Sequence, residues 1–230
     1  MFDDFKELLS IFNAQKVKYL IVGGYAVSFH AQPRATKDID VLIKPDADNA
    51  KAVLAALANF GAAVEGLTAE DFIERDKFFR MGRAPVMVDI ISEISGVDFD
   101  QAWQQRVEAV IDPQSSLTAF FISREDLIAA KLAAGEYEEA IRLLRERIDA
   151  DPGAAGLYLE LGLTQAKLGR HMEAVRTFQT MIRMGLDGFL VHRSLYLQYE
   201  ILGNTSASQH HRVIYLQKYD ALLKLKASLN

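Results

Sequence analysis

The sequence predicts two domains: an α/β (α+β) domain with a mixed β-sheet, followed by an all-α domain of helical repeats. Over residues 1–125, segments with helical periodicity alternate with short apolar segments typical of strands. Over residues 126–230 no convincing strand pattern occurs, and glycines recur every 34 residues at Gly135, Gly169 and Gly203. We therefore place the domain boundary after residue 125.

The first half opens with a helix, because Phe5, Leu8, Leu9 and Phe12 share one helical face. "VKYLIVGG" (17–24) predicts an apolar strand ending in two glycines, and "YAVSFHAQ" (25–32) predicts a helix. "DIDVLI" (38–43) predicts the second strand. An Ala-rich helix over 47–61, closed by Gly61, follows it.

The rest of the first half predicts three further strands and one helix. "KFFRMGRAPVMVDIIS" (77–92) indicates a hairpin with a Gly-containing turn between two apolar strands. "FDQAWQQ" (99–105) favours a helix, and "LTAFFIS" (117–123) a last strand. The expected architecture is a mixed sheet with helices packed on it.

The second half repeats more than its glycines. Ala140 and Ala174, and Leu161 and Leu195, are also 34 residues apart, and the segment 135–182 resembles tetratricopeptide repeats. We expect 2.5 to 3 units, the third (188–225) being a degenerate end cap. A capping-box-like start at Ser123 opens a helix that runs to the first repeat glycine, which predicts a rigid junction between the domains.

Composition narrows the class of protein. Half of the residues are hydrophobic and a quarter charged, which is typical of a packed globular protein. The absence of cysteine excludes disulfides, thiolate metal sites and a cysteine nucleophile. The amino-terminal segment does not read as a signal peptide, and the longest apolar run is about half a membrane span. We expect a soluble, cytoplasmic protein with no membrane partner.

The charge is unevenly divided between the two halves. Residues 1–125 hold 13 Lys and Arg against 19 Asp and Glu, whereas residues 126–230 hold 13 against 12. Neither half is a basic surface of the kind that binds nucleic acid through its phosphates. A nucleic-acid partner is therefore possible but not favoured.

Three acids within predicted strands suggest chemistry. Asp38 and Asp40 share a strand face, so their carboxylates stand about 6–7 Å apart and need either a positive charge between them or a proton on one. The alternative is an edge strand with solvated acids. Asp89, inside "VMVDII", needs an ion pair, a hydrogen bond or a metal, because burying an unpartnered charge costs several kcal/mol.

Together these features have one coherent physical interpretation. Backbone N–H groups of Gly23 and Gly24, at the start of a helix, can approach phosphate oxygens because no side chain blocks them. Converging carboxylates can hold one or two Mg²⁺, which activate an attacking hydroxyl and neutralise a leaving pyrophosphate. Asp89 is also placed as a candidate acceptor of the hydroxyl proton.

The stretch "GGYAVSFHAQPRATKDIDVLI" together with "VDIIS" resembles the nucleotidyltransferase superfamily that includes DNA polymerase beta and the aminoglycoside nucleotidyltransferases. It is most similar to the small bacterial branch of abortive-infection toxin nucleotidyltransferases, over residues 3–134. The resemblance implies that Asp38, Asp40 and Asp89 are catalytic and bind the metal. It implies nucleotide binding by Gly23, Gly24, Arg34, Thr36, Lys37 and Lys131.

One departure from that branch concerns the end of the domain. Its members typically continue "LIAAKLAAG" with an arginine, a Lys-Asp pair and further acids, whereas here repeat sequence follows Gly135. Lys131 is either a phosphate contact or a surface lysine of the first repeat, and the acceptor is left undefined.

Three functional hypotheses follow. The first is a Mg²⁺-dependent nucleotidyltransferase that moves a nucleoside monophosphate from a nucleoside triphosphate to an unknown hydroxyl acceptor, with the repeats recruiting the acceptor or a protein or peptide partner. The second is a non-catalytic, nucleotide-binding scaffold. The third is one half of a toxin–antitoxin pair whose partner occupies the repeats.

Overall fold

The computed structural model describes residues 1–31, 36–74, 77–83 and 86–228. Contacts between residues divide the chain into two compact units, Met1–Ala134 and Gly135–Asn230. The first unit has a mixed β-sheet with helices, and the described residues of the second unit form helices joined by turns, with no strand. The predicted fold class is therefore confirmed.

The first unit contains a six-stranded sheet in the order β3-β4-β2-β1-β6-β5. Its strands are β1 (Tyr19–Val22), β2 (Ile39–Ile43), β3 (Phe78–Arg83), β4 (Val86–Ile91), β5 (Val107–Asp112) and β6 (Leu117–Phe121). Its helices are α1 (Asp3–Ala14), α2 (Gly23–His30), α3 (Ala47–Phe60), the 3₁₀ helix η1 (Ala69–Phe72), α4 (Phe99–Gln105) and α5 (Arg124–Ala133). The pairs β1/β6 and β2/β4 are parallel, and the other neighbours are antiparallel.

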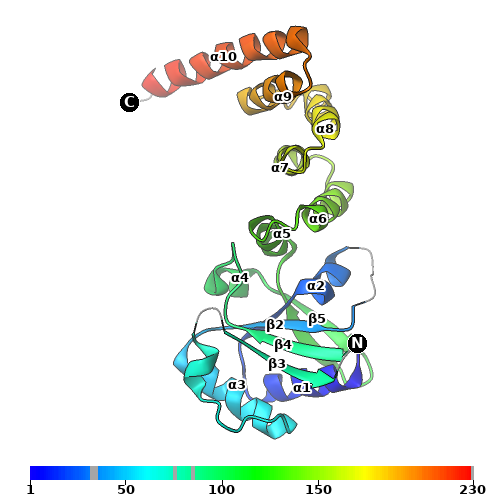
Figure 1. Ribbon diagram of the computed structural model, residues 1–230, viewed down its shortest axis with the longest axis vertical. Coiled ribbons are helices and arrows are strands. Elements are labelled where there is room, and N and C mark those ends of the chain that lie inside the picture. The colour runs from blue at the N-terminus through cyan, green and yellow to red at the C-terminus, as the bar shows by residue number, and fades with distance from the viewer. Residues whose placement is uncertain (32–35, 75–76, 84–85, 229–230) are drawn as a thin grey trace. The chain divides into compact units, whose positions relative to one another are not determined.

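The two faces of the sheet are covered differently. Helices α1 and α3 lie on one face, while α2, α4 and α5 lie on the other (Figure 1). Because side chains alternate along a strand, Ile39, Val41 and Ile43 of β2 all enter the core on the α1/α3 side, where they are fully buried. Asp40, between them, faces the α2 side.

A buried asparagine ties α3 to the strands beside it. Asn49 accepts a 2.7 Å hydrogen bond from the backbone N–H of Lys18, and its amide donates to the carbonyls of Lys18 and Lys44, each at 3.0 Å. These bonds satisfy backbone groups at the paired ends of β1 and β2, which would otherwise be costly to bury. They fix β2, and with it the acids it carries.

Every helix and strand predicted for the first half is present, and two elements were missed. The strand β5 is an edge strand whose alternation is weak, since Val110 is 58% exposed. The 3₁₀ helix η1 is too short to give a periodic pattern, although its start is marked by a capping box between Thr68 and Asp71.

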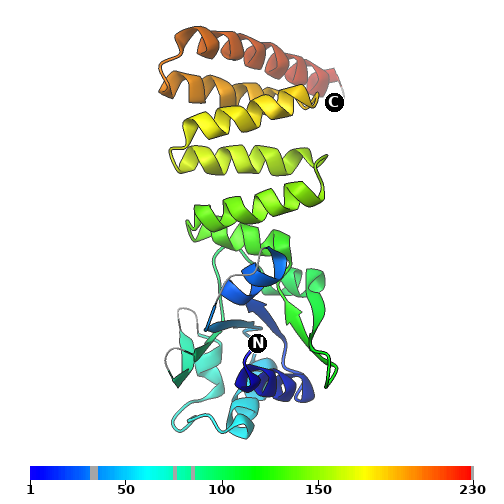
Figure 2. The same cartoon turned by 90° about the vertical axis from the view of Figure 1, so that its right-hand side faces the viewer.

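The described residues of the second unit form five helices that stack one after another (Figure 2). They are α6 (Tyr137–Ala150), α7 (Ala155–Lys167), α8 (His171–Arg183), α9 (Phe189–Ile201) and α10 (Thr205–Ser228). Gly135, Gly169 and Gly203 each adopt a positive φ of 72° to 74°, and each directly follows the C-cap residue of a helix, α5, α7 and α9 respectively. The 34-residue period therefore marks one repeated backbone turn.

Two details concern the ends of the repeats. At the position of the fully buried Ala140 and Ala174, the third unit has Ser208, which is also buried.

Helix α5, which the sequence predicts to open the repeats, packs against α2 in the first unit. Its amino terminus is capped as expected, because the Ser123 hydroxyl accepts from the backbone N–H of Asp126 at 3.0 Å.

No helix in the described part of the chain is both long enough and apolar enough to cross a membrane.

Gly162 allows α7 and α8 to pack closely. A Cβ atom at this position would lie 2.4 Å from Cε1 of Phe178, a fully buried side chain of α8. We predict that Gly162→Ala lowers the free energy of unfolding by about 1–3 kcal/mol, because the ring has to shift in a packed core.

The matched control is Gly156→Ala in the same helix. Within the described residues no atom lies within 4 Å of a Cβ there, so this change should raise stability by up to about 1 kcal/mol through helix propensity. Urea unfolding followed by circular dichroism measures both. Equal effects of the two changes would contradict the packing argument.

A histidine pair joins α9 to α10. His192 and His211 face each other with their Nδ1 atoms 3.0 Å apart, and the Tyr199 ring stacks on His211. Burial, followed by the charges of His192 and His210, lowers the pKa of His211 to about 4. Burial and Lys218 also lower the pKa of His192, although Asp187, 3.9 Å from its Nε2, opposes them.

We predict that acid destabilises this pair of helices. Unfolded histidine has a pKa of about 6.5, so between about pH 6.5 and 4 the unfolded chain binds more protons, and stability falls as pH falls. His211→Gln should flatten this pH dependence, whereas His210→Gln, at an exposed position, should flatten it much less, because the charge of His210 is the smallest of the causes that act on His211. Thermal unfolding from pH 7.5 to 4.5 tests this, and identical slopes for both variants would contradict it.

Candidate active site

Asp40 lies against the first turn of α2. A Cβ atom on Gly23 would come within 1.9 Å of Oδ2 of Asp40, and Gly23 has a positive φ of 58°. The backbone N–H of Gly24 donates to the Asp40 carboxylate. The glycine pair therefore lets the strand carboxylate reach a helix amino terminus, where a negative charge is stabilised.

Three charged residues form a row across neighbouring strands. Arg80 of β3 is the register partner of Asp89 on β4, and Asp89 is the register partner of Asp40 on β2. Register partners point their side chains to the same face, so the three groups meet on the α2 side of the sheet. Asp89, only 13% exposed, receives two hydrogen bonds of 2.6 Å from Arg80, from Nε and from Nη2.

Asp38 precedes β2 and completes the set of acids. It is exposed, and its Oδ1 accepts from the backbone N–H of Met87 on β4 at 3.2 Å. It shares a strand face with Asp40, and its charge contributes to the environment of both Asp40 and Arg80. The structure thus places Asp40 and Asp89 on one face of the sheet, with Asp38 close enough for its charge to act on Asp40.

The other predicted site residues are placed unevenly. Thr36 is close to the glycine pair, because a Cβ on Gly24 would lie 2.7 Å from its Oγ1, and that hydroxyl donates to the carbonyl of Asp38 at 3.2 Å. Lys131 on α5 is near enough to lower the pKa of Asp40 through its charge. Lys37 is exposed. Arg34 lies outside the described residues.

The electrostatics of the site are dominated by burial of negative charge. Burial raises the pKa of Asp40, and the charge of Asp89 raises it further, against the lowering effect of the Gly24 N–H and Lys131. The hydrogen bonds to Asp89 raise the pKa of the Arg80 guanidinium. The positive charge that the sequence requires beside the acids is therefore supplied in part by Arg80.

The acids suit a hard divalent cation in their chemistry, since Mg²⁺ prefers carboxylate oxygens. The arrangement of the acids in this structure does not form a metal site. Within the described part of the chain, no group of three or more His, Asp or Glu side chains is positioned to hold a metal ion. Both oxygens of Asp89 are instead bonded to Arg80. A cation held by all three acids would therefore lie close to the positive charge of Arg80.

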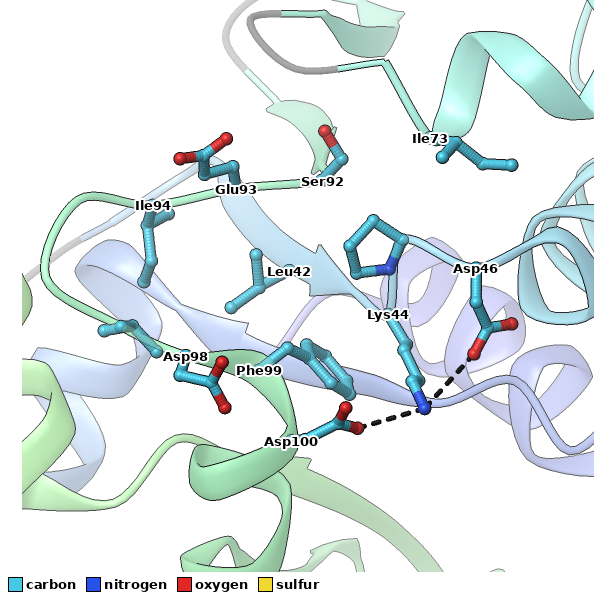
Figure 3. A pocket seen from close by; sticks show the side chains of 12 residues that line it. Leu42, Lys44, Asp46, Ile73, Ser92, Glu93, Ile94, Asp98, Phe99 and Asp100 are labelled. Carbon is cyan, nitrogen blue, oxygen red and sulfur yellow. Dashed lines mark ion pairs between the residues drawn. The ribbon is translucent and has the colours of Figure 1, made fainter.

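A pocket of about 610 Å³ lies beyond the acids on β2 (Figure 3). Leu42, which shares a strand face with Asp40, lines it. Lys44 pairs there with Asp46 at 3.2 Å and Asp100 at 3.0 Å, as the dashed lines in Figure 3 show. Further acidic residues line this pocket, so its charge disfavours a triphosphate. Asp46 also caps α3 by accepting from Asn49 N–H, which gives it a structural role.

The sequence patterns did not single out Arg80 as a site residue. The signal was present, because the hairpin over 77–92 was predicted and pairing its strands from Arg83 and Val86 leads to Arg80 opposite Asp89. The predicted turn contained Gly82, which is in fact a strand residue with a φ of 113°. The position of the turn, and hence the register, was therefore not defined by the sequence pattern.

We predict that Gly23→Ala disrupts the site, because the new methyl group overlaps the Asp40 carboxylate. The free energy of unfolding of the first unit should fall by about 3 kcal/mol or more, combining the left-handed φ with the clash. Urea unfolding followed by the fluorescence of the single tryptophan, Trp103, reports on this unit.

Gly61→Ala is the control for backbone strain. Gly61 also has a positive φ, 84°, but among the described residues no atom lies within 4 Å of a Cβ there. We expect a loss of only about 1–2 kcal/mol. If the two substitutions cost the same, the contact between Gly23 and Asp40 does not constrain residue 23.

Comparison with known proteins agrees with this geometry. Residues 1–148 match the family described as "Nucleotidyltransferase of unknown function (DUF6036)", and residues 131–192 match the tetratricopeptide repeat. A search of curated proteins found no match. The family match spans more than half of the chain and includes the glycine pair, all three acids and Arg80. The chain belongs to this nucleotidyltransferase family and carries tetratricopeptide repeats after its nucleotidyltransferase domain.

Proposed function

We propose that the protein transfers a nucleoside monophosphate from a nucleoside triphosphate to a hydroxyl acceptor, with Mg²⁺ as cofactor. The observation that supports this most is the direct register of Asp40 and Asp89 on neighbouring parallel strands, with Asp38 on the same face beside a glycine-opened helix. The alternative interpretation of the acids was an edge strand with solvated carboxylates. Strand β2 is not an edge strand, because it lies inside the sheet between β1 and β4.

The proposed reaction exchanges one phosphorus–oxygen bond for another. The acceptor oxygen bonds to the α-phosphorus, the bond from the α-phosphorus to the bridging oxygen breaks, and pyrophosphate leaves with that electron pair. The hydroxyl proton passes to a carboxylate, for which we propose Asp89. Asp38, Asp40 and Asp89 would hold Mg²⁺, which supplies charge neutralisation for the phosphates and activates the hydroxyl.

The residues around the acids have separate proposed roles. The amino terminus of α2 and Lys131 supply positive potential on the side where phosphates would bind. Thr36 orders the loop that leads into Asp38, through its bond to the Asp38 carbonyl. We propose that the repeats recruit the acceptor or a protein partner, because stacked helical repeats present extended binding surfaces.

A non-catalytic scaffold is the second candidate, and one observation favours it. Arg80 donates to both oxygens of Asp89, so its positive charge opposes the binding of a metal or a proton at that carboxylate. A partner bound to the repeats, as in a toxin–antitoxin pair, would be compatible with either candidate. The two candidates differ in whether pyrophosphate is released.

We predict pyrophosphate release and transfer of label when the protein is incubated with α-labelled nucleoside triphosphates, Mg²⁺ and a cell extract as the source of acceptors. Asp40→Asn should reduce the rate by about 100-fold or more, since it removes several kcal/mol of charge stabilisation. Asp48→Asn, an exposed residue of α3, should leave the rate unchanged.

The opposite result has a definite meaning. If the wild type and an Asp38→Ala/Asp40→Ala variant bind each nucleotide equally, and neither releases pyrophosphate with or without Mg²⁺, the protein is not a nucleotidyltransferase in function. The scaffold would then be the better description of the first unit.

A further inference from the structure

Arg80 belongs to the row of charges but to none of the roles above. Its guanidinium donates from Nε and Nη2 to the two oxygens of Asp89, in the two-pronged geometry that makes arginine–carboxylate pairs strong. It is an internal cation placed beside the three carboxylates that the proposed function assigns to a metal.

The position of Arg80 is set by the sheet and not by a mobile loop. Arg80 lies within β3, and its backbone is in register with Asp89, so the two side chains are directed to the same face. The charges of Asp38 and Asp40 also act on the guanidinium. One positive group therefore faces all three acids in the described structure.

The guanidinium is nevertheless able to leave. Its side chain is 54% exposed, in contrast to Asp89, which is 13% exposed. The exposed Phe78 ring, on the same face of β3, lies 5.4 Å from the guanidinium carbon and offers a surface on which it can stack. Arginine has several rotatable bonds, so it can move without any change in β3.

We propose that Arg80 competes with the divalent cation for Asp89, so that metal binding requires its guanidinium to move away. This inference rests on the proposed function, because it takes the three aspartates as metal ligands. A guanidinium and a divalent cation repel each other at the short distances that shared carboxylate oxygens impose. The same pair that neutralises the acids in the metal-free protein therefore weakens the binding of free metal.

The first measurement is the affinity of the full chain for Mn²⁺ alone, by titration calorimetry or by the spin resonance of free Mn²⁺. Arg80→Gln should bind Mn²⁺ at least about tenfold more tightly than the wild type, since the competing charge is gone. Arg80→Lys, which keeps the charge but loses the two-pronged contact, should fall between them.

Arg83→Gln is the matched control, because it removes an equal charge from an exposed position on the same strand. It should change the affinity by less than about twofold, since exposed charges are screened by solvent and salt. If Arg83→Gln and Arg80→Gln give equal gains, the effect is one of overall charge and the competition is refuted.

The second measurement is thermal stability with and without Mg²⁺. Without metal, Arg80→Gln leaves Asp89 without its cationic partner, so the variant should unfold at a lower temperature than the wild type. Added Mg²⁺ should raise the unfolding temperature of Arg80→Gln more than that of the wild type, because it replaces the missing cation. A side chain that only supports β3 would not produce this metal-dependent difference.

The remaining outcomes separate this inference from the proposed function. If the wild type binds Mn²⁺ in a manner that Asp40→Asn abolishes, and Arg80→Gln does not bind more tightly, competition is wrong while the proposed function stands. If neither the wild type nor Arg80→Gln binds Mn²⁺, both are wrong.

Discussion

Negative charge on a largely covered face of a β-sheet has to be compensated, and the first unit is organised around this requirement. Asp40 is compensated by the amino terminus of α2, Asp89 by Arg80, and Asp38 by solvent and the N–H of Met87. Each compensation comes from a different element. The geometry of the site is therefore held by the sheet order and by the start of α2, and not by the acids themselves.

The sheet order explains why these compensations occur together. Strand β2 lies between β1, which leads directly into α2, and β4, which carries Asp89. The antiparallel pairing of Val22 with Asp40 places the carboxylate beside Gly23, the first residue of α2. On the opposite face, Asn49 bonds the strand ends to α3. A shift of β2 by one residue would turn Asp40 into the apolar core, so the register is strongly specified.

The sequence predicted an element of the fold correctly wherever its pattern is compatible with only one kind of secondary structure. The buried stripe of α1, the alternation in β2 and the 34-residue spacing of positive-φ glycines all predicted their elements. The same patterns placed the three acids on neighbouring strands. They did not predict β5, whose Val110 points to solvent, or the partner of Asp89. That partner depends on hairpin register, which Gly82 obscured because glycine is more common in turns than in strands.

The difference between an enzyme and a scaffold on this framework comes down to how firmly Arg80 holds Asp89. A fully buried arginine–aspartate pair would rarely separate, because its separation leaves two unpaired charges in a medium of low dielectric constant. Arg80 is instead half exposed on an edge strand, where ion pairs contribute little and exchange readily. The pair therefore neutralises Asp89 when no metal is bound, and a cation that enters the site can displace it. An exposed arginine opposite a covered aspartate is thus compatible with an active site in its metal-free state.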